Sequence, residues 1–216
     1  MNTTLVISYD ASVSDDFFDD LRADTADESL QLTFRSRVVG PTNALEWVLA
    51  ATVIVVLTKP FLDAFLKRAA DDVADLVYPK LKASVSKLAC KVLIATRETW
   101  RRHTSSGPRP RIGRSSFFSI ESETRQSTRI KFVFNEAADQ DVYEKCISQA
   151  FTLFEAHHTD STVDPFAGAP VETAHNTIYM VYDDGNACWQ AIDLNEEVRR
   201  IAHESRERQK NTNDGR

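Results

Sequence analysis

The sequence lacks the short motifs that identify most catalytic sites. It contains no glycine-rich phosphate loop, no GxSxG or HExxH motif and no CxxC pair. Its three cysteines, Cys90, Cys146 and Cys188, are odd in number, widely spaced and set in apolar surroundings. We therefore expect reduced, buried thiols in a cytoplasmic protein, and neither a disulfide framework nor a Cys–His nucleophile.

The chain has no excess of positive charge either. Lys and Arg number 26 against 32 Asp and Glu, and the resulting net charge of −6 argues against general affinity for nucleic acid. The first residues, Met1–Thr4, carry no basic group and lead directly into an apolar run, so we expect no signal peptide. With 42% hydrophobic residues, the 216-residue chain can form one large domain or two small ones.

The most apolar and most β-branched run, Val53–Leu57, lies inside a longer apolar stretch, Ala44–Tyr78. β-branched side chains suit a pleated surface, and about six residues suit a strand that is buried on both faces between helices. Pro60 can then begin the next helix. Alternatively, Ala44–Leu57 is one apolar helix that ends before Pro60. We favour the strand, and we expect the remaining elements to cover it.

A membrane span is a third interpretation of the same stretch. A spanning helix needs about 20 predominantly apolar residues. Here Glu46 lies at one end of the stretch, and Lys59, Pro60 and Asp63 interrupt the other end. A buried core segment explains the run better, so we do not expect membrane insertion.

Hydrophobic periodicity and turn residues predict the other elements. In the N-terminal half they are strands at Leu5–Tyr9 and Leu30–Arg35, an acidic helix with Val13, Phe17 and Leu21 as its buried stripe, and two helices that begin near Pro60 and Pro79. In the C-terminal half they are strands around Phe118–Ile120 and Ile130–Phe134 joined across Ser122–Ser127, a helix at Asp139–His157, a long loop at Thr159–Asn176, a hairpin across Asp183–Asn186, and a last helix, Glu196–Arg208, capped by Asn195.

The element order βαβαβαα, linker, ββαββ predicts an α/β protein. The first part, residues 1–103, suits a parallel layer with a helical extension, and the second part, residues 115–208, suits an α+β unit with an antiparallel sheet. These parts form either separate units or one mixed sheet. Residues 104–114 are a basic Gly/Pro linker, and we expect the polar tail, residues 209–216, to be disordered.

Five arginines in and beside this linker are candidate binding residues for an acidic partner or a phosphate. They are Arg101, Arg102, Arg109, Arg111 and Arg114. A run of this kind is also typical of a solvated connector, so both interpretations stay open.

Residues 1–78 resemble Toll/interleukin-receptor (TIR) domains in outline. TIR domains open with a strand that ends in a Phe-Ile-Ser-Tyr-like motif, and this chain has Val6–Tyr9 there. They continue with an acidic helix, a second strand, a Pro/Gly loop, a helix and a very apolar strand that ends in Ser or Thr, often before an aromatic residue; this chain has Thr58–Phe61. The resemblance implies a TIR-like α/β fold. The Glu46–Trp47 pair with the apolar run also resembles small bacterial proteins of no known activity.

NAD-cleaving TIR domains use a Glu on the helix that follows the apolar strand. The corresponding stretch here, Phe65–Ala70, contains no Glu, and the candidate catalytic replacements are Asp71 and Asp72, whose side chains are one carbon shorter. Catalytic geometry tolerates little displacement. The resemblance therefore implies an interaction module in preference to an NAD hydrolase.

Two polar clusters invite a metal interpretation. His157, His158 and Asp160 are close in sequence, but adjacent residues on a helix point about 100° apart. We interpret the histidines as solvated groups at a helix C-terminus, where the helix dipole favours them. Turn chemistry explains Asp183 and Asp184. We therefore predict no metal site and no cofactor.

The sequence as a whole predicts a non-catalytic protein-interaction or regulatory module of a bacterial signalling or defence system. Its expected partner is another protein or a second copy of the chain, and not nucleic acid. One alternative is a TIR-like NAD- or nucleotide-processing enzyme with Asp71 or Asp72 as the acid. Another is a peripheral membrane-associated protein that inserts Ala44–Leu57.

Overall fold

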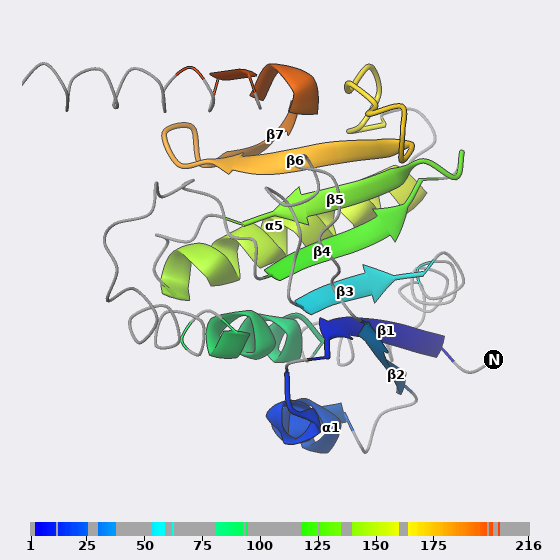
Figure 1. Ribbon diagram of the computed structural model, residues 1–216, viewed down its shortest axis with the longest axis vertical. Helices are drawn as coiled ribbons and strands as arrows, with labels where there is room; N and C mark the ends of the chain where they lie inside the picture. Colours follow the sequence, from blue (N-terminus) through cyan, green and yellow to red (C-terminus); the bar gives the residue numbers. More distant parts are fainter. Residues whose placement is uncertain are drawn as a thin grey trace, which may run out of the picture.

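The structure is a computed structural model, and it describes residues 3–11, 13–25, 30–37, 53–58, 62, 81–92, 94, 118–124, 126–134, 140–159, 164–197, 199–200 and 203. Within these ranges seven strands form one sheet in the order β2-β1-β3-β4-β5-β6-β7 (Figure 1). The strands are β1 (Thr3–Asp10), β2 (Leu30–Arg37), β3 (Val53–Leu57), β4 (Phe118–Glu123), β5 (Arg129–Val133), β6 (Thr177–Asp183) and β7 (Cys188–Ile192). The helices are the 3₁₀ helix η1 (Asp15–Phe18), α1 (Asp19–Thr25), α5 (Gln140–Thr159) and the helical residues 81–92.

The predicted α/β class is confirmed, and the sheet is mixed. The pairs β1–β2, β3–β4 and β5–β6 are parallel, whereas β1–β3, β4–β5 and β6–β7 are antiparallel. The β-branched run is a strand, as its composition predicted, and four of its five residues are buried. Because β3 pairs with β4, strands from both parts of the chain belong to one sheet, which is the second of the two arrangements left open by the sequence.

The direction of β3 differs from the prediction. The first part of the chain was expected to form a parallel layer, but β3 runs antiparallel to β1. Tyr9 lies opposite Val53 and the two strands run antiparallel. Asp10 pairs with Arg37, so β2 ends at the same end of the sheet at which β3 begins. A chain that re-enters a sheet at the end where it left needs no crossover and runs antiparallel. Hydrophobic periodicity carries no information on strand direction, which is why the prediction was wrong.

The second part also differs from a purely antiparallel sheet. Both predicted hairpins, β4–β5 and β6–β7, are present. The chain then passes from β5 through α5 to β6, and this crossover makes β5 and β6 parallel. The Asp-Gly hairpin turn is formed as predicted, with Asp183 Oδ1 accepting a hydrogen bond of 2.9 Å from the backbone N–H of Gly185.

One face of the sheet carries the main hydrophobic core. α5 crosses this face behind β4 and β5 (Figure 1). Its predicted buried stripe is confirmed and consists of Tyr143, Ile147, Ala150, Phe151 and Phe154. The helical residues 81–92 add Leu81, Val85, Leu88 and Val92 to the same core. Lys82 Nζ donates to Ser148 Oγ of α5 over 3.1 Å, which joins these two helices.

Aromatic rings fill the core between α5 and the second half of the sheet. The ring of Phe132 packs edge-on against Trp189 at a centroid distance of 4.7 Å, and Phe134 does so at 5.2 Å. The indole Nε1–H of Trp189 donates to the backbone carbonyl of Cys146 over 3.0 Å. This geometry satisfies the polar atom of the indole while its rings stay buried.

The opposite face of the sheet is polar at its centre. Glu121 of β4 lies directly opposite Lys131 of β5, and the Oε1 and Nζ atoms form an ion pair of 3.0 Å. Both side chains are largely buried. Towards β7 the face becomes apolar, where Val133, Tyr179 and Val181 pack against Leu194.

Two helix beginnings differ from the sequence prediction. The acidic helix starts as the 3₁₀ helix η1, which has three residues per turn. This change of phase buries Phe18 completely and leaves Phe17 only partly buried. The last helical residues are capped by Asp193 and not by Asn195, because Asp193 Oδ1 accepts a hydrogen bond of 2.8 Å from the backbone N–H of Asn195.

In the part of the chain that the structure describes, no helix combines the length and the apolar character that crossing a bilayer requires.

The position of β3 leads to a stability prediction. Leu57 is fully buried in the core, so we expect Leu57→Ala to lower the free energy of unfolding by about 3 kcal/mol, through lost apolar contact and a cavity. Chemical denaturation monitored by circular dichroism measures this change. Ile94→Ala is the control, because Ile94 is exposed and its loss costs less than about 0.5 kcal/mol. Equal effects of the two substitutions would contradict the central position of β3.

Candidate functional site

The candidate site residues selected from the sequence lie outside the described residues. These are Asp71 and Asp72, proposed as acids, and Arg101, Arg102, Arg109, Arg111 and Arg114, proposed as binding residues. The linker at 104–114 and the tail at 209–216 lie outside them too. The described residues that can form a site belong to the sheet, its helices and the loops between them.

The longest described segment between regular elements is residues 164–176, here called the 164–176 loop, which joins α5 to β6. It is drawn in yellow beside the beginning of β6 in Figure 1. Pro165 and Pro170 have no backbone N–H, and Gly168 adopts a left-handed φ of 75°, so neither a helix nor a strand can run through the segment. Compact surface loops of this length are frequently functional.

The first anchor of the loop is at the end of α5. His157 Nδ1 lies 2.7 Å from Asp164 Oδ1, and the backbone N–H of Phe166 donates to the same oxygen over 2.9 Å. Phe166 is buried, and its ring lies 5.3 Å from that of His157. His157 is 3% exposed, so its interpretation as a solvated group at a helix end is wrong. Loop residues cover the imidazole, and the spacing of residues along α5 could not show this.

The second anchor is the carboxylate of Glu172. Its Oε1 accepts the backbone N–H of Ala174 over 2.9 Å, and its Oε2 accepts the backbone N–H of His175 over 2.9 Å and lies 3.0 Å from the ring Nδ1 of His175. Glu172 also forms an isolated β-bridge with Thr177. Burial raises the pKa of Glu172, but these hydrogen bonds outweigh it and hold the pKa below the ordinary glutamate value.

The third anchor ties the loop to the β4–β5 turn. Asn176 Nδ2 donates to the backbone carbonyl of Ser127 over 3.1 Å, and the backbone N–H of Arg129 donates to the carbonyl of Asn176 over 2.8 Å. Ser127 and Asn176 both have left-handed backbones, with φ of 62° and 49°. Such conformations persist only where the surroundings hold them. The end of the loop and the turn are therefore fixed together.

The outward surface of the loop is poor in charge. Between Pro165 and Asn176 only Glu172 belongs to the Asp, Glu, Lys and Arg set, although these types make up 27% of the chain. The carboxylate of Glu172 is turned inward, and its side chain is 9% exposed. Val171 is 43% exposed and is one of two large hydrophobic residues exposed in the described part of the chain; the other is Ile94.

No motif in the sequence singles out Glu172 as a functional residue. The available sequence signal was that Glu172 precedes His175 by three residues within a loop that contains Pro and Gly. This signal is not specific to a site, because the same spacing in a helix gives only a solvated i, i+3 pair. What gives Glu172 its role is the bridge to Thr177, and that bridge depends on the tertiary fold.

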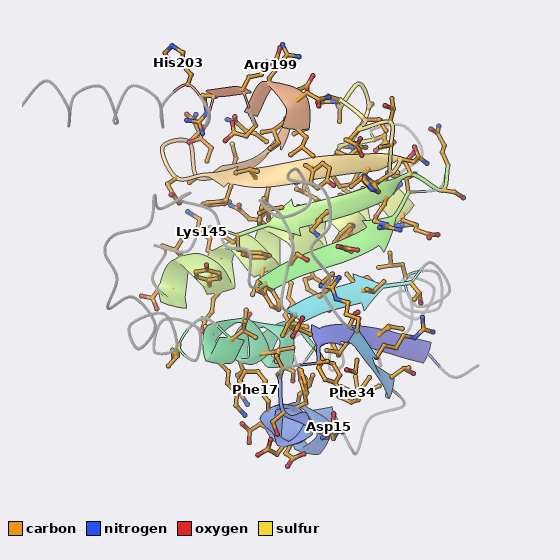
Figure 2. The ribbon with its side chains drawn as sticks, viewed as in Figure 1. Asp15, Phe17, Phe34, Lys145, Arg199 and His203 are labelled. Carbon is orange, nitrogen blue, oxygen red and sulfur yellow. The ribbon has the colours of Figure 1, made fainter. Side chains whose placement is uncertain are left out.

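A second cluster lies at the corner formed by η1 and α1. Four carboxylates, those of Asp15, Asp16, Asp19 and Asp20, occupy the first turns of these two short helices and are exposed. Figure 2 shows Asp15 and Phe17 of η1 near Phe34 of β2. Acidic residues favour helix N-termini, which accounts for the position of these four.

Cations of the same corner hold the acidic groups in place. Arg22 pairs with Asp19 over 2.8 Å and stacks on the ring of Phe34 at 4.4 Å. Lys91 pairs with Asp20 over 2.8 Å. The hydroxyl of Tyr9 donates to Asp15. These contacts dock α1 on the sheet and on the helical residues 81–92, so a structural role explains the corner.

The three cysteines are free. Cys146 is buried, whereas Cys90 and Cys188 are half-buried. Burial, with the charge of Asp184 as a further cause, raises the pKa of the Cys146 thiol to about 12. Burial also raises the pKa of Cys90. Thiols of this kind are protonated at neutral pH and are poor nucleophiles.

Comparisons of the chain with protein-family models, with curated proteins and with solved structures give no match. The likeness to TIR domains therefore stays a prediction. The antiparallel pairing of β1 with β3 departs from the parallel layer that the element order predicted for the same residues.

The anchoring role of Glu172 predicts a pH-dependent stability difference. The folded-state pKa of Glu172 lies below its ordinary value, so its contribution is present above the unfolded-state pKa and is lost as the pH falls through the folded-state pKa. We expect Glu172→Gln to destabilise the protein by about 1 kcal/mol at pH 7, and the difference from wild type to shrink as the pH falls below the ordinary glutamate pKa of about 4.3. Thermal unfolding at several pH values measures it. The exposed Glu196→Gln is the control, and a pH-independent difference for Glu172→Gln would contradict the assignment.

The burial of Cys146 predicts its resistance to alkylation. We expect iodoacetamide at pH 8 to modify Cys146 in the folded protein at least about 100-fold more slowly than the half-exposed Cys188, because almost no thiolate forms at Cys146. Mass spectrometry of the peptides after timed labelling measures both rates. In denaturant the two thiols should be alkylated at equal rates, which is the control. Similar alkylation rates of Cys146 and Cys188 in the folded protein would show that Cys146 is accessible.

Proposed function

We propose that the protein is a non-catalytic protein-interaction module that binds a partner through the 164–176 loop. The observation that carries the proposal is that a charge-poor, exposed loop is held at its beginning, middle and end by hydrogen bonds to its own backbone, to α5 and to the β4–β5 turn. Charged residues are depleted at the centres of protein interfaces. The surface of this loop has the same depletion, with Val171 as its exposed apolar residue.

The anchors support recognition because they reduce the entropy cost of binding. A flexible loop must be ordered when a partner binds, whereas a pre-ordered loop loses little conformational freedom. Asp164, Glu172 and Asn176 fix the beginning, the middle and the end of this loop through hydrogen bonds. Their acceptors and donors come from α5, from the loop itself and from the β4–β5 turn.

The biological setting in this proposal comes from the TIR-like motifs of residues 1–78. They suggest a bacterial signalling or defence system, in which interaction modules join sensors to effectors. We place the protein in the cytoplasm, where a reducing environment keeps cysteines such as Cys90, Cys146 and Cys188 unpaired.

Site-specific photo-crosslinking tests the proposed function. A photoreactive amino acid at the exposed loop residue Thr173 is compared with one at the exposed Thr152 of α5, each introduced into the full chain in its native cells. We expect a protein adduct at position 173 that is absent at position 152 and is lost when Val171→Asp is added. With the partner purified, Val171→Asp should raise the dissociation constant about tenfold, because a buried, unpaired charge opposes binding.

Absence of an adduct at position 173 beyond the level at position 152 would refute the proposal. A second assay addresses the enzyme alternative. Consumption of NAD by the purified protein, abolished in an Asp71→Ala/Asp72→Ala variant, would replace the interaction module with a TIR-like enzyme.

A further inference from the structure

We propose that the surface formed by the 164–176 loop and the adjacent β4–β5 end binds a second copy of the same chain across a two-fold axis. This inference rests on the proposed function, because it names the partner of the same loop. The contact also involves Glu123 and Arg129, two charged residues beside the loop.

The four residues concerned are side by side at one end of the sheet. Glu123 of β4 is the register partner of Arg129 of β5, Arg129 is the partner of Thr177 of β6, and Thr177 bridges to Glu172 of the loop. Neighbouring strands are about 4.8 Å apart, so this row extends about 14 Å from Glu123 to Glu172. Thr177 and Glu172 are turned inward, whereas Glu123 and Arg129 are exposed.

The Glu123 and Arg129 side chains do not use their charges on each other. Directly opposite residues of an antiparallel pair have Cβ atoms about 5 Å apart, close enough for an ion pair. Within the described residues, however, the ion pair of this hairpin joins Glu121 to Lys131, and neither Glu123 nor Arg129 takes part in one. Both side chains are exposed and are not held in an ion pair within the described residues, so they are available to a partner next to the charge-poor loop.

This arrangement complements itself under a two-fold rotation. In an isologous contact the same patch is used twice, so a residue contacts a different residue of the other copy and the contact is repeated reciprocally. A negative and a positive residue side by side meet this requirement, because Glu123 of each copy can face Arg129 of the other. The loop, with Val171 exposed, supplies the uncharged part of the contact.

Charge also determines which surface can make a self-contact. The chain carries a net charge of −6, so two copies repel each other on average. The corner of η1 and α1 presents four exposed carboxylates and would increase this repulsion. That corner lies beside β1 and β2, at the other side of the sheet from β5 and β6. The loop surface carries fewer exposed carboxylates and lies at a distance from that corner.

Analytical ultracentrifugation of the full chain over a concentration series tests the proposal. We expect a monomer–dimer equilibrium. Glu123→Arg and Arg129→Glu should each raise the dimer dissociation constant about fivefold or more, since each places like charges face to face twice in the dimer. The double variant Glu123→Arg/Arg129→Glu restores opposite charges and should return the constant to near the wild-type value. Val171→Asp should weaken the dimer, and Ile94→Asp, at the other exposed hydrophobic residue, should leave it unchanged.

Each outcome decides the proposal. The proposal is overturned if the chain stays monomeric at every concentration. It is also overturned if the single charge reversals leave the dimer dissociation constant unchanged, or if the double variant does not restore the wild-type dissociation constant. Only variants whose unfolding temperature equals that of the wild type are interpreted. If a charge-reversal variant is less stable, the neutral Glu123→Gln or Arg129→Gln takes its place. A monomeric protein that still crosslinks a different protein at Thr173 would overturn this inference and leave the proposed function intact.

Discussion

The described structure depends on the position of β3 between two neighbours of opposite direction. β3 pairs antiparallel with β1 and parallel with β4, so its backbone N–H and C=O groups have partners on both sides. Val53, Val55 and Leu57 face the main core, and Ser122 Oγ of β4 donates to the carbonyl of Leu57 over 3.0 Å. Because β3 joins the two parts of the chain, the first two strands and the last four belong to one layer.

This layer determines where a rigid loop can form. The parallel pair β5–β6 places the start of β6 beside the start of β5, at the end of the sheet where the β4–β5 turn also lies. α5 returns the chain to that end, and His157 in its last turn meets Asp164. The 164–176 loop is therefore held by contacts from a helix, a turn and a strand that are distant in sequence. A loop held in this way keeps its shape without regular secondary structure.

The elements that periodicity could predict are those whose burial is local and regular. Val53–Leu57 forms a strand because five consecutive aliphatic residues fit a doubly covered strand. The stripe of α5 was visible from Tyr143 to Phe154 because a helix repeats its buried face about every 3.6 residues. The turn at Asp183–Asn186 could be predicted because an Asp-Gly pair between two runs of alternating apolar residues is typical of a β-hairpin.

What the sequence could not show depends on contacts between distant segments. The antiparallel direction of β3 follows from where β2 ends, and no side-chain pattern records this. The burial of His157 depends on Phe166, which lies nine positions later in a loop. The role of Glu172 depends on a bridge to Thr177. The candidate site was therefore missed for the same reason as the strand direction: both are properties of the assembled sheet.

The buried pair of Glu121 and Lys131 has a consequence for how the hairpin β4–β5 aligns. Side chains alternate between the faces of a sheet, so a slip of one residue would carry one of these charges into the apolar core. A slip of two residues would keep the faces but separate the charges, and each would then be buried without its counter-ion. The pair thus excludes both near alternatives and leaves a single alignment, in which Glu121 meets Lys131 at 3.0 Å. The buried ion pair in the middle of the sheet therefore specifies the register of the two strands that carry it.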